Sequence, residues 1–353
     1  MKILLTGFFH ENLGDDLFFH LITARYPQHT FYMNVHADHA NAYAGKPNVK
    51  LLRQTKPLRG LNKLLTALSP KLGIPALTGK FTDISVLIGG SMFQEHAGGL
   101  ARLAQMPRHK KGLYVLGINF GPYQTQTYLD HCRQYLAEAK DVCFRDSISY
   151  EHFSQLPNTR LGSDMVFGIE SLYPAAKTKE NTCVISLMDF SANPALANYA
   201  QDYFRFMQDM ISHQQSLGRK VILVSFCQWE GDRRAIEQLL RQLPQTQNLS
   251  TLYYDGKNAH AICQAISASA CVVASRFHSM VLGLAYGIPT IAISYSNKTR
   301  QLLADLGKDS FAIAPEALKN TCARDARPIT DVDLDRCKAQ AQSHFAALDD
   351  LLN

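Results

Sequence analysis

Short runs of apolar and β-branched residues alternate along the chain with longer segments of helical period. The runs of the first half span residues 3–6, 85–88, 113–117 and 142–144, and those of the second half span 183–187, 221–226, 251–254, 271–274 and 290–294. Each run has about the length of a buried strand, and strands that are apolar throughout are typical of parallel sheets with helices on both faces. The sequence therefore predicts an α/β fold built on parallel sheets.

The chain is long enough for two domains, since 353 residues correspond to about two units of ~150 residues. Segment 172–182 is polar, lacks periodicity and precedes a new apolar run, so we expect the linker there. The predicted domains are 1–174 and 175–353, the second with a C-terminal helix. In that second domain, 193–217 is expected to form a helix that ends at Gly218.

The expected C-terminal helix begins at Thr330, which can act as its N-cap. Its apolar residues are spaced alternately by three and four positions, as on one face of a helix. They are Leu334, Cys337, Ala341, Phe345, Leu348 and Leu352.

Composition narrows the class of protein further. Hydrophobic residues make up 46% of the chain and charged residues 19%, which excludes a disordered chain. The eight cysteines include no C-x-x-C pair, and we expect them to be buried thiols in a reducing compartment. The first nine residues indicate a strand rather than a signal peptide, and no apolar stretch is long enough to span a bilayer. These features predict a cytoplasmic protein.

The charges are distributed unevenly. The formal net charge is 36 − 30 = +6, which favours an anionic partner. Residues 39–82 contain no Asp or Glu, but residues 46–80 contain eight cations: Lys46, Lys50, Arg53, Lys56, Arg59, Lys63, Lys71 and Lys80. Within this stretch Leu58, Leu61, Leu64, Leu65 and Leu68 fall on one helical face. We expect this face to pack on the first sheet; the alternative is a surface helix that rests on an anionic membrane.

Ligands of open parallel sheets bind where strands end, so polar strand–helix junctions are candidate sites. The first junction carries Asn12, Gly14, Asp15 and Asp16, although helix capping alone could explain the two acids. A second junction carries Gly89-Gly90, a weak signal. The G-x-G-x-x-G fingerprint, the P-loop and H-E-x-x-H are absent from the sequence, which disfavours a nicotinamide enzyme, a P-loop NTPase and a helix-borne zinc protease.

The most informative junction follows the run 271–274, where Ser275 can cap a helix that carries Arg276, His278 and Ser279 at its start. A helix N-terminus, a guanidinium and an imidazole together suit a phosphate or carboxylate. Lys298, which follows the next apolar run, supplies a further cation at the same sheet edge. Arg145 offers another from the first half. The alternative is that Arg276 pairs with a carboxylate and that His278 is a satisfied core histidine.

A series of motifs runs along nearly the whole chain. They are Asn12-x-Gly14-Asp15, Gly89-Gly90, Arg145-Asp146-Ser147, Ser163-Asp164-x-x-Phe167, and Arg276-x-His278 followed by Gly287-x-Pro289, Ile291, Tyr295 and Lys298. In order and spacing, these motifs resemble the polysaccharide pyruvyl transferase family. Departures are Ser91, where a third glycine is common, and Met165, where proline often follows the aspartate. The resemblance implies a GT-B-like fold, with two Rossmann-like domains facing a central cleft.

The resemblance also implies a reaction. Phosphoenolpyruvate would be the donor, as a co-substrate with no further cofactor, and two hydroxyls of one sugar residue would be bridged by a pyruvate ketal. The acceptor would belong to an exopolysaccharide, a capsule or a cell-wall glycopolymer, often as a lipid-linked oligosaccharide. The first domain would serve the acceptor and the second the donor.

The residues then receive expected roles. His278 is the expected general acid, since an imidazole donates a proton near neutral pH. Asp15 is the candidate base, although Asp16, Glu11 and His10 remain open. Expected donor ligands are Arg276, Ser279, Lys298 and Arg145, and expected acceptor ligands are Asn12, Gly14, Asp16 and Gly90.

Two other functions remain open on the sequence alone. One is a GT-B glycosyltransferase that uses a nucleotide sugar, because the same cations could bind a diphosphate. The other is a non-catalytic scaffold in polysaccharide assembly. Nucleic acid is not an expected partner, because the basic stretch lacks interleaved aromatic residues, and nothing in the sequence requires a metal.

Overall fold

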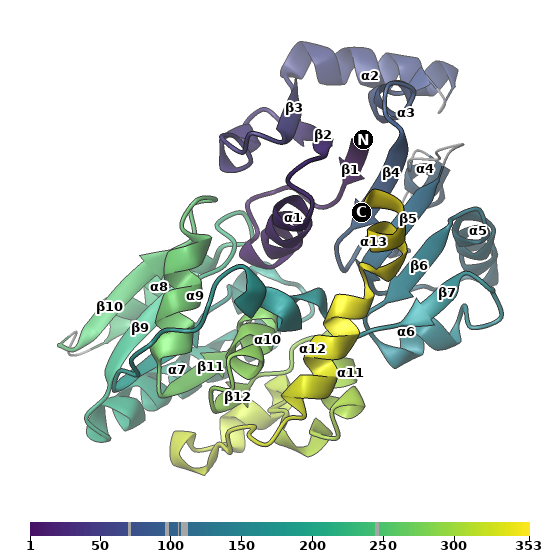
Figure 1. The fold of residues 1–353 in the computed structure, drawn as a ribbon. Coiled ribbons are helices and arrows are strands. Elements are labelled where there is room, and N and C mark those ends of the chain that lie inside the picture. The colour runs from purple at the N-terminus through teal and green to yellow at the C-terminus, as the bar shows by residue number, and fades with distance from the viewer. Residues whose placement is uncertain (70–71, 96–98, 105, 107–111, 244–246) are drawn as a thin grey trace. The chain divides into compact units, whose positions relative to one another are not determined.

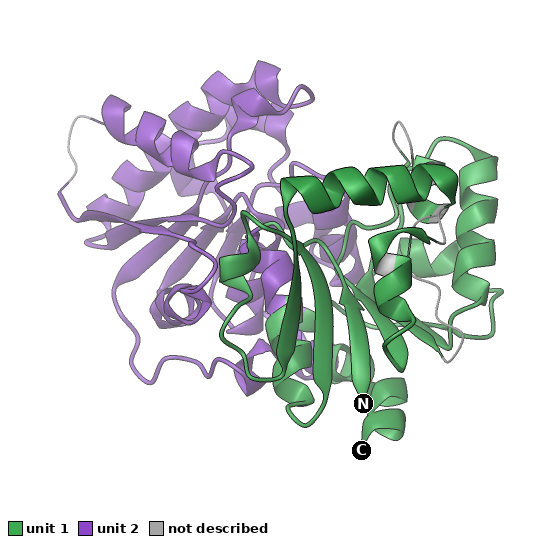
Figure 2. Ribbon diagram, turned by 90° about the horizontal axis from the view of Figure 1, so that it is seen from above, with its two compact units in different colours: residues 1–10, 18–165, 339–353 green, residues 11–17, 166–338 purple. Residues whose placement is uncertain are grey.

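The computed structural model of the chain describes residues 1–69, 72–95, 99–104, 106, 112–243 and 247–353 (Figure 1). They form two compact units, shown in different colours in Figure 2. The first unit consists of residues 1–10, 18–165 and 339–353, and the second of residues 11–17 and 166–338.

The first unit contains a parallel sheet, seven-stranded in the described part of the chain, in the order β3-β2-β1-β4-β5-β6-β7. The strands are β1 (Lys2–Thr6), β2 (Thr30–His36), β3 (Val49–Gln54), β4 (Ile84–Ile88), β5 (Leu113–Ile118), β6 (Asp141–Phe144) and β7 (Thr159–Leu161). Every residue of β4, β5 and β6 is buried, as expected of central strands covered on both faces.

Helices join these parallel strands. They are α2 (Lys56–Leu68), α3 (Ile74–Gly79), α4 (Gly99–Ala104), α5 (Gln126–Ala137) and α6 (Ser147–Glu151), with α13 (Ala346–Leu352) from the C-terminus. Residues 18–25 of α1 (Leu13–Arg25) also belong to this unit, whereas its first turn belongs to the second unit. Figure 1 shows α13 beside the sheet, although its residues lie at the opposite end of the chain from the strands of that sheet.

The second unit contains a parallel sheet, five-stranded among its described residues, in the order β10-β9-β8-β11-β12. The strands are β8 (Thr182–Ser186), β9 (Lys220–Ser225), β10 (Leu249–Tyr253), β11 (Cys271–Ala274) and β12 (Thr290–Ala292). The helices are α7 (Ala200–Ser216), α8 (Asp232–Gln242), α9 (Ala259–Ala268), α10 (Phe277–Ala285) and α11 (Asn297–Asp305), followed by α12 (Leu334–Ser343), which ends in the first unit. The predicted α/β class with parallel sheets is therefore confirmed.

All nine apolar runs of the sequence are strands. The prediction lacked β2, β3 and β7. In β2, buried residues alternate with half-buried ones, and no residue of β3 or β7 is buried, so these strands lack the continuous apolar character by which the others were found.

The main change of unit lies between Met165 and Val166, whereas we expected the boundary after residue 174. The difference arises because Val166, Phe167 and Ile169, in the 3₁₀ segment Met165–Ser171, are buried and belong to the second unit. The C-terminal residues 339–353, expected in the second domain, belong to the first unit.

Two predicted helices differ from those observed. The helix expected over 193–217 begins only at Ala200, because residues 197–199 form a 3₁₀ turn, and it ends before Gly218, which has φ +76°. The expected C-terminal helix is divided into α12 and α13 around His344. Apart from the half-buried Leu334, its predicted apolar stripe is buried.

The prediction that the leucines around residues 58–68 pack on the first sheet is wrong for most of them. No side chain of α2, all of whose residues the structure describes, is buried. Leu61, Leu64 and Leu68 are 49%, 62% and 72% exposed, whereas Leu58 and Leu65 are half-buried. Lys71 lies outside the described residues.

All eight cysteines are free thiols, and seven are buried; Cys322 is exposed, contrary to the expectation for it. Among the residues that the structure describes, no helix combines the length and the apolar character that crossing a membrane requires.

Candidate functional site

Each sheet has a point at which the strand order reverses direction, and such switch points open crevices at the carboxyl ends of the strands. In the first sheet this point lies between β1 and β4, and in the second between β8 and β11. The loops that leave these strands carry Asn12, Gly90 and Arg276. Topology alone therefore places three of the predicted site residues at preferred ligand-binding positions.

The loop after β11 is held by its neighbour β8. The buried Ser186 hydroxyl, at the end of β8, accepts hydrogen bonds from the backbone N–H groups of Ser275 (3.0 Å) and Arg276 (3.2 Å). The Ser275 hydroxyl accepts a hydrogen bond from the Tyr203 hydroxyl at 2.8 Å. The expectation that Ser275 caps α10 is wrong, because the chain turns into the helix one residue later and Arg276 is the N-cap.

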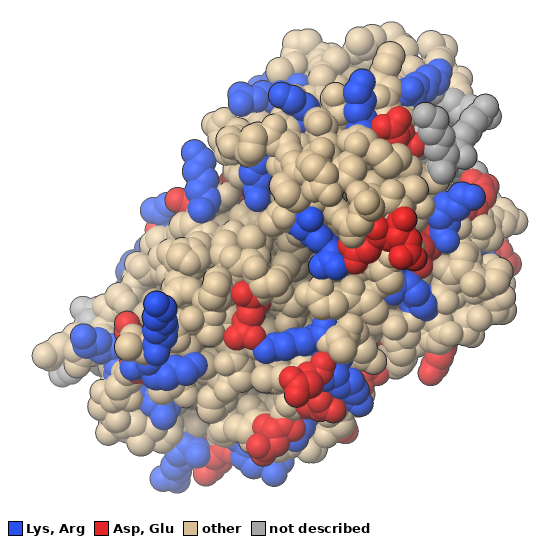
Figure 3. Space-filling model, viewed as in Figure 1, with Lys and Arg blue, Asp and Glu red and all other residues tan. Residues whose placement is uncertain are grey.

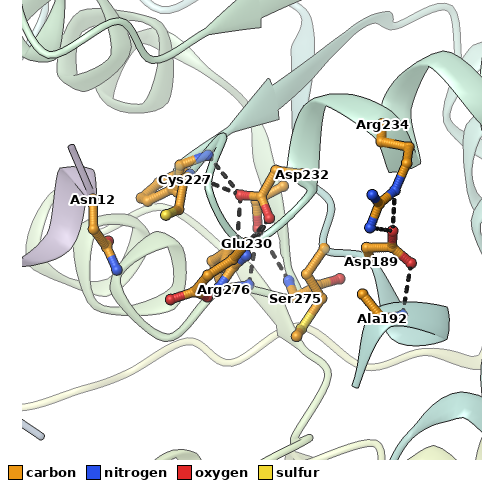
Figure 4. Close-up of polar contacts among 12 residues, drawn as sticks. Asn12, Asp189, Ala192, Cys227, Glu230, Asp232, Arg234, Ser275 and Arg276 are labelled. Carbon is orange, nitrogen blue, oxygen red and sulfur yellow. Dashed lines mark hydrogen bonds and ion pairs between the residues drawn. The ribbon is translucent and has the colours of Figure 1, made fainter. Parts of the chain in front are cut away.

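Arg276 is buried and paired with two carboxylates, as Figure 4 shows. Its Nε lies 3.0 Å and 3.1 Å from the two carboxylate oxygens of Asp232, and its Nη2 contacts the same carboxylate. Its Nη1 donates a hydrogen bond to Glu230. The guanidinium is therefore neutralised from two sides, as the alternative interpretation of Arg276 anticipated.

The carboxylates of Asp232 and Glu230 differ in how far they are buried and held by hydrogen bonds. Asp232 is fully buried, opens α8, and accepts hydrogen bonds from the backbone N–H groups of Phe226 (2.8 Å) and Cys227 (2.9 Å). Glu230 is less restrained, since 40% of its side chain is exposed. Burial opposes ionisation of Glu230, but Arg276 and then Lys298 hold its pKa below the usual value. A ligand anion can thus reach Arg276 most readily by replacing Glu230.

The loop after β1 passes from the first unit to the second at Glu11, so Asn12 and the first turn of α1 belong to the second unit. The Leu13 N–H donates a hydrogen bond to the Phe226 carbonyl at 3.0 Å, and Asn12 forms an isolated antiparallel bridge with Cys227. The Asn12 carboxamide accepts a hydrogen bond from the Gly14 N–H at 3.2 Å. These backbone contacts attach the start of α1 to the loop that carries Glu230 and Asp232.

The same attachment places Gly14 against His278. A Cβ atom on residue 14 would lie 1.8 Å from His278 Nδ1, so only glycine fits beside this imidazole. His278 itself is 8% exposed and packs edge-on against the Phe277 ring. The structure therefore joins two motifs that lie more than 260 residues apart in the sequence.

The two acids after Gly14 lie in different surroundings. Asp16 is fully buried and accepts a hydrogen bond from the Tyr254 hydroxyl at 2.8 Å, whereas Asp15 is half-buried. Glu11, just before them, has φ +53°, an uncommon backbone conformation for a residue with a side chain. The geometry therefore distinguishes Asp15 from Asp16, which the sequence could not do.

The remaining predicted donor ligands of this unit lie on α10 and α11. Ser279 is fully buried in the first turn of α10. Lys298, in the first turn of α11, is half-buried, and its Nζ lies 5.5 Å from the centre of the Phe277 ring. Both residues are therefore close in the chain or in space to the Arg276–His278 segment.

The first unit has a polar centre of its own at Arg145, which follows β6. Arg145 Nη1 lies 2.9 Å from the buried Asp164 carboxylate, and Nη2 donates a hydrogen bond to the Asn119 side-chain oxygen at 2.7 Å. A Cβ atom on Gly90 would lie 2.2 Å from Nη2, so the glycine permits this close approach. Arg145 and Gly90 are thus brought together in this unit, and the other predicted site residues in the second unit.

Several polar residues of these centres were missed by the sequence analysis. Asp232 and Glu230 lie in a strand–helix junction, after the run 221–226, that we did not rank among the candidates. Its two acids within three positions were a usable signal. Tyr254 and Ser186 gave no signal, because their importance depends on which loops meet in the folded chain. Among the described residues, no group of three or more His, Cys, Asp or Glu side chains is arranged to hold a metal ion.

Comparison with known proteins identifies the family of the chain. Residues 12–297 match the family model described as polysaccharide pyruvyl transferase. The amylovoran biosynthesis protein AmsJ of Erwinia amylovora is 21% identical over 280 residues, which cover 70% of this chain and 66% of AmsJ. The aligned part thus spans just under two thirds of the length of that relative.

The fold of this chain resembles those of several proteins of known structure. The UDP-GlcNAc 2-epimerase of Neisseria meningitidis bound to UDP-GlcNAc is 10% identical, with a TM-score of 0.59 over 99% of this chain and all of that one. Sucrose-phosphate synthase of Thermosynechococcus elongatus is 14% identical, with a TM-score of 0.51 over 99% and 98% of the chains. Similarity at this level concerns the fold alone, and it agrees with the expected GT-B-like class.

Proposed function

Because the chain belongs to the polysaccharide pyruvyl transferase family, we propose that it transfers the pyruvyl group of phosphoenolpyruvate to two hydroxyls of one sugar residue. The products are inorganic phosphate and a cyclic pyruvate ketal. The observation that carries the proposal is the family match over residues 12–297. The Arg276-x-His278 segment, Gly14, Glu230 and Asp232 fall within this range, and Lys298 follows it directly.

The proposed donor site lies at the switch point of the second sheet. Phosphoenolpyruvate carries a carboxylate and a phosphate, which the N-terminus of α10, Lys298, the Ser279 hydroxyl and Arg276 can bind. In this arrangement the donor replaces Glu230 on Arg276 Nη1, while Asp232 keeps the guanidinium in place. Arg145 is the proposed further cation from the first unit.

Transfer begins with a proton. His278 gives a proton to the methylene carbon of the donor, whose double-bond electrons form the new C–H bond and leave a cationic centre at the carbon that bears the phosphate. One sugar hydroxyl adds to this carbon and loses its proton to a base. The second hydroxyl then attacks the same carbon and loses its proton to the departing phosphate, which leaves with the electrons of its C–O bond, and the ketal closes. Nearby cations stabilise the departing phosphate.

Asp15 is the proposed base. It is half-buried, whereas the carboxylate of Asp16 is enclosed and already accepts a hydrogen bond from Tyr254. Asn12, Gly14 and Gly90 are the proposed acceptor contacts, with Asp16 positioning the loop through Tyr254. Gly14 keeps this loop against His278, so acid and base would lie on the same side of the donor.

For the acceptor we propose a sugar residue of an exopolysaccharide, a capsule or a cell-wall glycopolymer, free or as a lipid-linked oligosaccharide. The similarity to a protein named for amylovoran biosynthesis supports a polysaccharide acceptor.

Donor binding can be tested without knowing the acceptor. Thermal unfolding is followed with phosphoenolpyruvate, inorganic phosphate, and UDP- and GDP-sugars as ligands. Phosphoenolpyruvate at 100 times its Kd is expected to stabilise the protein by ~2.7 kcal/mol. Lys298→Ala is expected to weaken this effect. Lys308→Ala serves as the control, since Lys308 likewise lies over a phenylalanine ring, 5.8 Å from the centre of Phe311.

Arg276→Ala is unsuitable as the first variant, because removing one partner of a buried ion pair commonly costs 3–5 kcal/mol of stability. A response to nucleotide sugars alone would instead indicate a glycosyltransferase. Absence of any ligand response, with the protein folded, would contradict the donor site and favour a scaffold.

A further inference from the structure

Helix α2 presents leucine side chains to solvent. Leu61, Leu64 and Leu68 are 49%, 62% and 72% exposed, and their spacing of three and four residues places them in one stripe along the helix. Monomeric soluble proteins rarely expose contiguous apolar surface unless it has a binding role. This stripe therefore requires an explanation.

The exposure is not due to a detached helix. The Asn62 side-chain oxygen accepts a hydrogen bond from the Ile74 N–H at 2.7 Å, which ties α2 to the start of α3. The Thr78 hydroxyl of α3 in turn donates to the Asn34 side-chain oxygen of β2 at 3.3 Å. Leu58 and Leu65 are half-buried. The helix thus has a side turned toward the first unit and another that carries the leucine stripe.

Cations accompany the stripe. Lys56, Arg59 and Lys63 share the three- and four-residue spacing and are all exposed, so they form a second stripe on the same helix. Figure 3 shows Lys and Arg side chains along the part of the surface at which Figure 1 draws α2. The sequence from residue 39 to 82 contains no acid to neutralise them. The surface is therefore both apolar and strongly cationic.

We propose that α2 is a membrane-association surface, which lies on a bilayer with anionic lipid headgroups and inserts Leu61, Leu64 and Leu68 between them. Charge complementarity favours this occupant over a second copy of the chain, because two copies joined through α2 would bring their cations together. Leucines and Lys or Arg side chains on one short helix are the combination that binds in the interfacial plane. The inference goes beyond the proposed reaction and does not depend on it.

Vesicle flotation of the full chain tests this proposal without donor or acceptor. Vesicles of phosphatidylcholine alone are compared with vesicles that contain about one third phosphatidylglycerol, at low and high salt. We expect binding to the anionic vesicles only, and its loss at high salt.

Two triple variants separate the stripes. Leu61→Ser/Leu64→Ser/Leu68→Ser removes the apolar stripe, and its control is Ile148→Ser/Leu217→Ser/Leu351→Ser, at exposed apolar positions elsewhere. Lys56→Ala/Arg59→Ala/Lys63→Ala removes the cationic stripe. Its control, Lys220→Ala/Arg241→Ala/Lys257→Ala, makes the same change in net charge at exposed positions of the second unit.

The cationic variant is expected to bind anionic vesicles about 100-fold more weakly. The affinity of the leucine variant for anionic vesicles is expected to fall at least tenfold. Both control variants should bind these vesicles about as tightly as the unchanged protein. Because all substituted side chains are exposed, thermal unfolding should remain unaltered, which verifies folding. The proposal is overturned by absence of vesicle binding, by binding that both α2 variants retain, or by a dimer in sedimentation that only the leucine variant abolishes.

Discussion

At the scale of single residues, the contact between Gly14 and His278 gives the sharpest prediction. Gly14→Ala would place a methyl group 1.8 Å from His278 Nδ1, so the loop or the imidazole must move. Because overpacking of a buried contact typically costs 1–3 kcal/mol, we expect a loss of stability in that range. If His278 is the acid, turnover should fall by more than tenfold, because catalysis depends on its position.

Gly60→Ala is the matched control for that substitution. No atom lies within 4 Å of a Cβ placed on Gly60, and the residue is exposed in the interior of α2. Alanine there should stabilise the protein by roughly 0.5–1 kcal/mol. The free energy of unfolding in urea and the turnover number are measured for both variants. A Gly14→Ala protein with unchanged stability and turnover would contradict the close contact between Gly14 and His278.

Glu230 allows a second prediction at this scale, since its carboxylate occupies Arg276 Nη1, where the donor is proposed to bind. Glu230→Gln keeps the size of the side chain and removes the competing charge. The apparent KM for phosphoenolpyruvate is expected to fall about fivefold, the equivalent of a partly exposed ion pair worth ~1 kcal/mol. Steady-state kinetics at saturating acceptor measures the effect.

Glu237→Gln controls for the loss of a carboxylate from α8. Glu237 pairs with Arg233 at 2.9 Å on an exposed face of the same helix, and its substitution should leave KM unchanged. An unchanged KM for Glu230→Gln itself would show that Glu230 does not compete with the donor. A fall in kcat alone would assign it to proton transfer.

At the scale of elements, the break between α12 and α13 makes stability dependent on pH. His344 lies in this break, fully buried, where its Nδ1 accepts a hydrogen bond from the Gly117 N–H (3.2 Å) and its Nε2 donates to the Ser163 carbonyl (2.6 Å). The bond from Gly117 requires an unprotonated Nδ1, and burial lowers the pKa of His344 to about 4 against the opposing effect of the Ser163 carbonyl.

The direction of this pH dependence follows from the number of protons that His344 binds in the folded and in the unfolded state. Between pH 6.5 and about 4 the unfolded chain binds a proton at His344 that the folded chain excludes, so stability falls as the pH falls through this range. The full effect is roughly 3 kcal/mol. His20, whose pKa burial lowers to about 3, acts in the same direction. The free energy of unfolding, measured with urea at several pH values from 7 to 4, should therefore depend less steeply on pH in His344→Gln than in the unchanged protein. An equally steep dependence in both proteins would contradict the assignment of this effect to His344.

Elements differed in how well the sequence predicted them, for a physical reason. Central strands such as β5 and β11 are buried on both faces, so they appear as continuous apolar runs. The edge strand β3 has no buried residue and was missed. The leucines of α2 were expected to pack on the first sheet, but most are exposed. Amphipathic spacing indicates that a helix has an apolar face, and it does not indicate what covers that face.

At the scale of the whole molecule, sequence patterns predicted the two sheets but not how the chain is divided between units. The motifs around Asn12 and Arg276 were recognised separately and assigned to different domains. Their joining depends on the hydrogen bond from Leu13 N–H to the Phe226 carbonyl, a backbone contact that no side-chain pattern records. Tyr254 and Ser186 were missed for the same reason, whereas the acids at 230 and 232 were a signal that the ranking of junctions overlooked.

This division leads to a prediction about donor binding. Segments 11–17, 226–232 and 275–280 all belong to the second unit and are linked by the Leu13–Phe226 hydrogen bond and the Asp232–Arg276 pair. A ligand that orders one of them should therefore order all three. Hydrogen exchange measured by mass spectrometry with saturating phosphoenolpyruvate should slow in these segments together, whereas α2 provides the internal control and should be unaffected. Protection confined to 275–280 would mean that the start of α1 is not part of the donor site, and the assignment of Asp15 as the base would then fail with it.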